Sequence, residues 1–222
     1  MRLAVYGGSF NPVHCGHLSV ADEALSLGYD KLLFVPTFIS PHKHLTASVS
    51  PSSRLAMLEA AIAGNPKFEI EPCELQRGGV SYTIDTIHFL LNKYRGRLDG
   101  KIGLVMGQEI ASEFHKWKEV EQVAGFCDLI IASRQNVGDK RAATSVNKPR
   151  GNYVGGVDAS GQFMGVDKSR FVWPYTELKN VIVPISSTEI RSRIAQGKSW
   201  RYLVPQAVYE YIVTNKLYGC KQ

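Results

Sequence analysis

Two histidines three residues apart follow a glycine-rich stretch near the start of the chain. His14 and His17 come after Gly7 and Gly8. The residues before this stretch are short, apolar and β-prone, and those after it have apolar side chains at helical spacing, so we predict a turn from a first strand into a first helix. Such a turn directs backbone N–H groups and a helix N-terminus at one point, which suits a phosphate. Because His17 falls in the first helical turn, both imidazoles can face the same anion.

The same two histidines have an alternative role as zinc ligands. No nearby Cys, Asp or Glu completes a tetrahedral ligand set for them, so the alternative is disfavoured. The sequence therefore predicts a phosphate site at this turn and no metal-ligating residues.

A second cluster of polar side chains follows an apolar stretch near residue 185. Ser186, with Glu189 three residues later, has the pattern of a capping box, which predicts a helix start and is by itself a purely structural explanation. That explanation leaves out the three consecutive hydroxyls, Ser186 to Thr188, ahead of Arg191. Free N–H groups, hydroxyls and a guanidinium fork together suit a di- or triphosphate.

These two segments resemble the signatures of one superfamily. Residues 8–17 resemble the G-x-F-D-P-x-H-x-G-H motif of the nucleotidyltransferases, and residues 185–191 resemble their I-S-S-T-x-I-R motif. The superfamily includes enzymes acting on nicotinate or nicotinamide mononucleotide, phosphopantetheine and glycerol phosphate. Asn11 stands where the bacterial motif usually has Asp. An amide keeps the size and one acceptor but loses the charge, so a structural hydrogen-bonding role survives and an acid–base role does not.

The middle of the chain resembles one group within the superfamily, the bacterial nicotinate mononucleotide adenylyltransferases. Residues 81–83 are similar to their S-Y-T element, and residues 41–43 match their P-H-K loop. Residues 107–109 with Trp117 resemble their G-x-D followed by a tryptophan. Four departures are plain: Asn11, Glu109 in place of Asp, Arg134-Gln135-Asn136 in place of R-P-G, and Lys118 where an aromatic residue is common. They leave the choice between nicotinate and nicotinamide open.

The resemblance implies that the 5′-phosphate of a pyridine mononucleotide attacks the α-phosphate of ATP and releases pyrophosphate. Because the attacking phosphate is already anionic, catalysis is expected from positioning and charge stabilisation rather than from a general base. Mg²⁺ is expected to be held by the triphosphate and water, without protein ligands. The implied catalytic residues are His14, His17 and Arg191. The residues implied for ATP are Gly7, Gly8, Ser9, Phe10, His42, Lys43, Gly107, Glu109, Arg134, Ile185, Ser186, Ser187 and Thr188. Those implied for the pyridine mononucleotide are Ser81, Tyr82, Thr83 and Trp117, the last as an exposed stacking surface.

The alternation of apolar β-prone and helical stretches predicts an α/β fold, a Rossmann-like doubly wound parallel sheet with helices on both faces. The 222 residues, 44% of them hydrophobic, suit one domain, with a small helical C-terminal part at 186–222. Residues 136–175 lack apolar periodicity and predict a loop insertion, with a lid or an oligomer contact as the alternative. Ligands are expected at the carboxyl ends of the first and fourth strands. Strands are expected near residues 3–6, 31–36, 68–70, 102–107, 129–133 and 181–184.

The composition of the chain limits which classes of partner and which cellular setting are expected. No apolar run approaches the roughly 20 residues of a membrane span, and the first residues show no signal-peptide pattern. The four scattered cysteines suggest a reducing, cytoplasmic setting. The net charge of +6 suits anionic ligands such as ATP and nicotinate mononucleotide, whereas a nucleic-acid partner has only that charge in its favour. No nucleic acid or membrane is therefore expected, and a homo-oligomer is left open.

Two other functions remain as alternatives at this point. One is a nucleotidyltransferase for nicotinamide mononucleotide or another phosphorylated acceptor, such as phosphopantetheine. The other is a nucleotide-sensing module without turnover. The intact His14, His17 and Arg191 argue against a sensor, which has no need for donors that stabilise a transition state.

Overall fold

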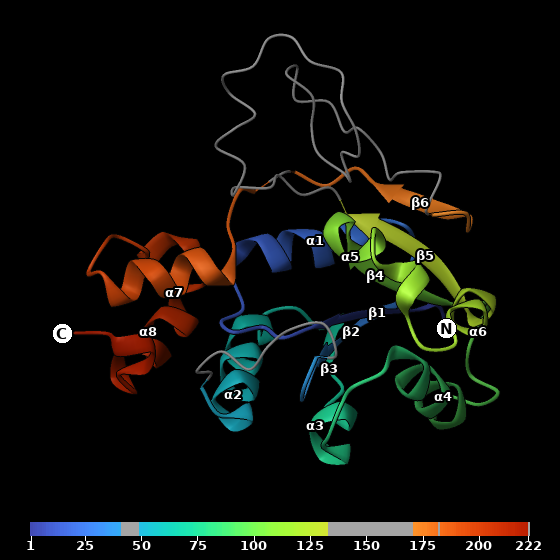
Figure 1. Cartoon of the computed structure of the whole chain (residues 1–222), viewed down its shortest axis with the longest axis horizontal. Coiled ribbons are helices and arrows are strands. Elements are labelled where there is room, and N and C mark those ends of the chain that lie inside the picture. The colour runs from blue at the N-terminus through green and yellow to red at the C-terminus, as the bar shows by residue number, and fades with distance from the viewer. Residues whose placement is uncertain (41–48, 133–170, 182, 222) are drawn as a thin grey trace, which may run out of the picture.

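The computed structural model describes residues 1–40, 49–132, 171–181 and 183–221. Its centre is a six-stranded sheet in the order β3-β2-β1-β4-β5-β6, with every neighbouring pair parallel (Figure 1). This confirms the predicted α/β fold with a parallel sheet. The strands are β1 (Leu3–Gly8), β2 (Lys31–Pro36), β3 (Phe68–Ile70), β4 (Ile102–Gly107), β5 (Cys127–Ala132) and β6 (Tyr175–Leu178).

Helices cover both faces of the sheet, as predicted. The α-helices of the described residues are α1 (Cys15–Leu25), α2 (Pro51–Ile62), α3 (Cys73–Arg77), α4 (Thr83–Lys93), α5 (Gln108–Ala111), α6 (Val120–Phe126), α7 (Ser187–Ala195) and α8 (Gln206–Thr214). Short 3₁₀ turns are η1 (Phe114–Lys116), η2 (Arg201–Leu203) and η3 (Leu217–Gly219). None of the helices in the described part of the chain is long and apolar enough to cross a membrane.

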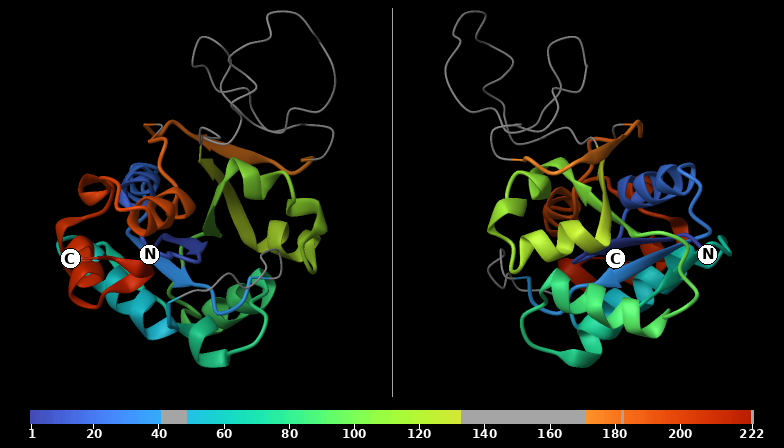
Figure 2. Two further views of the ribbon diagram at one scale, coloured as in Figure 1. Left: turned by 60° about the vertical axis from the view of Figure 1, so that its left-hand side comes forward. Right: turned by 90° about the vertical axis from the view of Figure 1, so that its right-hand side faces the viewer.

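Alternate residues of each strand enter two separate cores, because successive side chains of a strand point to opposite faces. In β2, Leu32 and Phe34 pack with α1, α2, α7 and α8, whereas Leu33 and Val35 pack with α4, α6 and η1. The C-terminal helix α8 packs against α2, so the red C-terminal elements lie beside the blue and cyan ones (Figure 2). The C-terminal helices therefore help to close the face of the sheet that α1 covers.

The direction of winding reverses between β1 and β4. The chain runs outward from β1 through β2 to β3, then returns to the other side of β1 and runs outward through β4 to β6. Pairing of β1 with β4 stops at Tyr6, whereas its pairing with β2 continues to Gly8. The carboxyl ends of β1 and β4 thus separate, and such a switch point is where ligands bind in open α/β sheets.

The last strand differs from the sequence prediction. A strand was expected at residues 181–184, but β6 lies earlier and Val181 is irregular and 72% exposed. Among the described strands β6 pairs only with β5, so it is at the edge of the described sheet and tolerates the polar Thr176 and Glu177, which hide the alternating pattern of a strand. Val181 and Val183 follow the sheet rather than joining it.

The expected loop at 136–175 also ends earlier than predicted. Phe171 and Trp173 pack on Phe114, with ring centroids 5.4 and 5.0 Å away, and Tyr175 opens β6. These aromatic residues belong to the core beneath α6. Residues 136–170, on which the rest of that prediction falls, lie outside the described residues.

The four cysteines are free thiols. Burial raises the pKa of Cys73 to about 11 and that of Cys127 to about 12, so both stay protonated and inert at neutral pH.

Gly103 of β4 provides a test of this packing. A Cβ placed on Gly103 would lie 2.4 Å from Cζ of the buried Tyr29, so Gly103→Ala should lower the free energy of unfolding by about 1–3 kcal/mol. Urea unfolding measures the change. The control is Gly64→Ala, whose Cβ would meet no atom within 4 Å and which should change stability by no more than about 0.5 kcal/mol. Equal effects of the two substitutions would contradict the packing described.

Candidate functional site

The loop between β1 and α1 is anchored by the ring of Phe10. Phe10 has a left-handed backbone, with φ of 45°, which is uncommon for any residue other than glycine. Its buried ring lies 5.7 Å from that of Tyr6 and 5.5 Å from that of Phe34. A Cβ on Gly8 would lie 3.0 Å from the same ring, so a larger residue there would push the ring out of its present position. The loop conformation is thus fixed by aromatic packing from below.

The two predicted histidines lie together at the start of α1. His14 is the N-cap residue and only 2% exposed, and its ring stacks on that of His17 with centroids 3.6 Å apart. The backbone N–H of His14 donates to Nδ1 of His17 at 3.3 Å. Because Nδ1 accepts this bond, the neutral imidazole of His17 has its proton on Nε2, which is then a hydrogen-bond donor.

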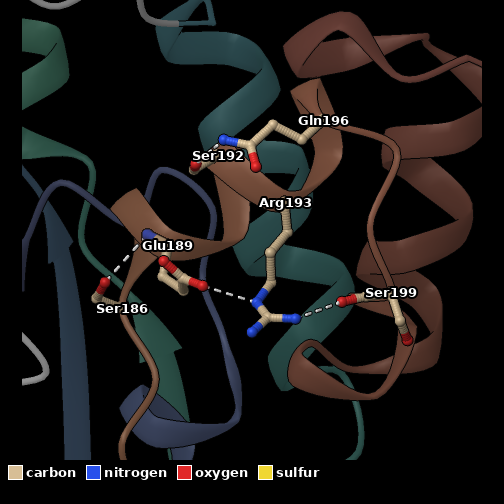
Figure 3. A network of polar contacts seen from close by, with 6 residues as sticks. All are labelled: Ser186, Glu189, Ser192, Arg193, Gln196 and Ser199. Carbon is tan, nitrogen blue, oxygen red and sulfur yellow. Dashed lines mark hydrogen bonds and ion pairs between the residues drawn. The ribbon is translucent and has the colours of Figure 1, made fainter.

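The helix predicted near residue 186 begins there. Oγ of Ser186 accepts a hydrogen bond from the backbone N–H of Glu189 at 3.1 Å, so the predicted N-cap is confirmed. The other half of the predicted capping box is replaced: the Glu189 carboxylate accepts from Nε of Arg193 at 2.8 Å (Figure 3). Arg193 in turn donates to the carbonyl of Ser199. An i,i+4 ion pair along α7 therefore turns this carboxylate away from the N-cap.

The two predicted phosphate motifs touch directly. Nη1 of Arg191 donates to the carbonyl of Asn11 at 2.7 Å, across 180 residues of chain. Oγ of Ser187 donates to the carbonyl of Pro12 at 2.9 Å. Nη2 of Arg191 also donates to Oγ1 of Thr188 at 3.2 Å, within its own helix. The start of α7 is thus fastened to the loop that leads into α1.

A cavity of about 1200 Å³ opens at the carboxyl ends of β1 and β4. It exceeds the few hundred to a thousand Å³ typical of small-ligand sites and has room for a dinucleotide. Of the predicted site residues, Gly7, Gly8, Ser9, Phe10, His14, His17, Ser81, Tyr82, Thr83, Gly107, Glu109, Trp117, Ile185, Ser186, Ser187, Thr188 and Arg191 line it. His42, Lys43 and Arg134 lie outside the described residues.

Trp117 is less exposed than the sequence suggested. Its ring packs on that of Phe114 at 5.0 Å and also lines the cavity, so it belongs to the core and to the site at once. Its Nε1 is buried and has no hydrogen-bond partner among the described residues. Beside it, Nζ of Lys118 lies 5.0 Å from the centre of the Tyr82 ring and 3.5 Å from Oδ1 of Asp85. The ring of Trp117, the expected stacking surface, therefore lies on the same wall of the cavity as the ammonium group of Lys118.

Glu74 is a residue of the cavity that sequence reasoning missed. It lies in the short helix α3, is 7% exposed, and accepts a hydrogen bond from Oγ1 of Thr86 at 2.7 Å. Burial raises the pKa of Glu74, although hydrogen bonds from Thr86 and Ser81 oppose the shift. Oγ of Ser81 also accepts from the backbone N–H of Phe38 at 3.1 Å. Glu74 thus braces the segment that enters α4, a role that only the folded chain reveals.

Comparisons with known proteins find relatives that match nearly the whole chain. The cytidylyltransferase-like family model matches residues 5–193. A probable nicotinate-nucleotide adenylyltransferase of Treponema pallidum (strain Nichols) is 39% identical over 220 residues, covering 98% of this chain and 99% of the relative. One of Borreliella burgdorferi is 34% identical over 219 residues, covering 98% and 97%.

Solved structures share the fold. The nicotinic acid mononucleotide adenylyltransferase of Plasmodium falciparum, complexed with NaAD, superposes with a TM-score of 0.68 at 18% identity. The superposition covers 99% of this chain and 98% of that one.

The buried carboxyl of Glu74 predicts a pH effect on stability. Because its pKa is raised in the folded state, its contribution to stability is full below the unfolded pKa of about 4.3 and is lost as the pH rises through the folded value. Glu74→Gln removes this loss, so the free energy of unfolding of the variant relative to wild type should rise between pH 4 and pH 7. Urea midpoints across that range measure it. The exposed Glu59→Gln is the control and should show no such trend; a constant difference for Glu74→Gln would refute the prediction.

Proposed function

Because this chain belongs to the cytidylyltransferase-like family, and within it to the nicotinate-nucleotide adenylyltransferases, we propose that it joins ATP to nicotinate mononucleotide. The products are nicotinic acid adenine dinucleotide and pyrophosphate, in a step of NAD biosynthesis. The observation on which the proposal depends is the direct contact of Arg191 with Asn11 at one edge of a cavity large enough for a dinucleotide. The free, scattered cysteines support a reducing, cytoplasmic setting for this activity.

The chemistry assigned to the phosphate end of the cavity is positioning and charge stabilisation. The mononucleotide phosphate displaces pyrophosphate from the α-phosphorus of ATP, and negative charge develops on the departing oxygen. Nε2 of His17 is a donor beside this centre, and His14 stacks behind it. A guanidinium has five N–H donors, so the two protein acceptors of Arg191 do not exhaust its capacity to bind phosphate oxygens.

The backbone surrounds the nucleotide in this proposal. Residues 7–10 approach it from the end of β1, and the N-terminus of α7 directs the N–H groups and hydroxyls of residues 186–188 at the β- and γ-phosphates. Gly107 and Glu109, at the end of β4, face the adenosine part, where a carboxylate suits the ribose hydroxyls. His42, Lys43 and Arg134 are assigned to ATP only by their resemblance to the family.

Mg²⁺ enters this scheme with the triphosphate. The acidic side chains lining the described part of the cavity are Glu74 and Glu109, and Glu74 already accepts hydrogen bonds from its own neighbours. Mg²⁺ keeps several waters and prefers phosphate oxygens to all-protein sites, which fits these surroundings. Bound there, the cation would neutralise charge on the leaving pyrophosphate.

The pyridine ring is assigned to the other end of the cavity. Residues 81–83 and Trp117 line it, and Trp117 presents an aromatic surface on which the ring can stack. The cations Lys116 and Lys118 line the same wall. Lys116 is paired with Glu113 and Lys118 with Asp85, but an ammonium group has three donors. A carboxylate on the ring accepts a further hydrogen bond from such a group more strongly than a neutral carboxamide does, so nicotinate is favoured over nicotinamide.

The substrate proposal is tested by measuring pyrophosphate release with ATP and each candidate acceptor in turn. We expect the kcat/KM for nicotinate mononucleotide to exceed that for nicotinamide mononucleotide by about tenfold or more, a difference of about 1.4 kcal/mol. Phosphopantetheine should give no release above background. A preference for phosphopantetheine would replace the proposal, and absence of turnover with all three would favour a nucleotide sensor.

The role of His17 is tested by His17→Ala. Loss of one preorganised donor at the reacting phosphate should lower kcat by about 10²–10³. The matched control is His88→Ala, an exposed histidine of α4 that does not line the cavity and should leave kcat near the wild-type value. Near-normal turnover of His17→Ala would remove this imidazole from the mechanism.

A further inference from the structure

A turn near the C-terminal end of the described chain reaches into the first phosphate loop. The phenol of Tyr218, in η3, donates to Oδ1 of Asn11 at 2.7 Å, across 207 residues of sequence. Asn11 is 7% exposed, so water cannot readily replace this partner. The bond confirms the prediction that Asn11 has a structural hydrogen-bonding role.

Three other side chains hold the backbone of the same loop. Nη1 of Arg54, from α2, donates to the carbonyl of Ser9 at 2.8 Å. Arg191 and Ser187, from α7, donate to the carbonyls of Asn11 and Pro12. In a trans peptide the N–H of the next residue points away from the carbonyl, so the Arg54 bond also sets the direction of the Phe10 N–H. Tyr218 differs from these three because it bonds to a side chain of the loop, the amide of Asn11, and not to a backbone carbonyl.

The backbone that presents Tyr218 is itself in an unusual conformation. Lys216 and Tyr218 have φ values of 49° and 58°, and Gly219 follows with φ of 76°. Left-handed backbone is unfavourable for residues with a Cβ, and it persists where the surrounding contacts impose it. These two residues adopt it in the turn that brings the phenol to Asn11.

We propose that Tyr218 is a positioning residue of the phosphate site, acting through Asn11 to hold the loop from which residues 9–10 and His14 face the triphosphate. The inference rests on the proposed function, because it assigns the loop to ATP. The phenol lies near the guanidinium groups of Arg54 and Arg191, yet burial outweighs them and raises its pKa. Tyr218 therefore remains a neutral donor throughout the range in which the enzyme is assayed.

Tyr218→Phe tests the proposal, because it removes one oxygen and keeps the ring. An unsatisfied buried amide should release the loop, so we expect kcat/KM for ATP to fall about tenfold while the KM for nicotinate mononucleotide changes less than about twofold. The control is Tyr202→Phe, a tyrosine of η2 that is 83% exposed and should leave both constants unchanged. Asn11→Asp, which keeps an acceptor for the phenol, should retain most of the activity.

A double-mutant cycle separates positioning from general stability. Asn11→Ala should reproduce the loss seen in Tyr218→Phe, and the double variant should be no slower than either single variant, because both remove the same bond. Unchanged ATP constants in Tyr218→Phe, or equal losses toward both substrates in step with a lower Tm, would overturn the proposal. Should Tyr218→Phe fail to fold, Asn11→Ala removes the same bond from the other side, and the same two outcomes decide the proposal.

Measuring the binding of an ATP analogue tests the positioning role of Tyr218 independently of the proposed reaction. If the wild-type protein makes no dinucleotide, the proposed function is wrong, and the positioning role is then read from calorimetric titration with α,β-methylene ATP. The Kd should rise about tenfold in Tyr218→Phe and stay constant in Tyr202→Phe. Equal Kd values for wild type and Tyr218→Phe would refute the positioning role whatever the reaction proves to be.

Discussion

The hydrogen bond from Arg191 to the carbonyl of Asn11 joins the two halves of the site. On one side of this bond lies the loop in which Phe10 has a left-handed backbone, and on the other lies the N-terminus of α7. Each of these segments can attract an anion alone, but the triphosphate of the proposed reaction needs donors on both sides at a fixed distance. The guanidinium sets that distance, because its planar fork binds a carbonyl of the loop and a hydroxyl of its own helix at once.

The sheet makes this contact possible by placing β1 at the point where the winding reverses. Pairing of β1 with β4 ends before its pairing with β2, so an opening forms above Tyr6 without interrupting the hydrogen bonds below it. Separate cores on the two faces hold the flanking helices, and the site residues arrive at the opening from α1, α4, α5 and α7. Most of the hydrogen-bond donors that line the cavity therefore lie on helices and strands or on loops that are hydrogen-bonded to them.

Much of this arrangement could be predicted from the sequence, because its signals are local. The glycine turn with its two histidines lies within residues 7–17 and the hydroxyl cluster within residues 185–191, and the structure brings both to one cavity. Glu74 carries no local signal, since only the packing of α3 against α4 brings it to the wall of the cavity. The last strand was misplaced because β6, at the edge, is more polar than the segment that follows it, which begins with the exposed Val181.

The Asn11–Tyr218 hydrogen bond also has a consequence for biosynthesis. A ribosome makes residue 218 some 207 positions after residue 11, so a nascent chain carries the Asn11 loop through all of that synthesis without the phenol that holds it. All six strands of the described sheet precede Tyr218 in the sequence, so this contact can form only after every one of them has been made. On the proposed role of Tyr218, full nucleotide affinity is therefore reached only after residue 218 has been made and has left the ribosome.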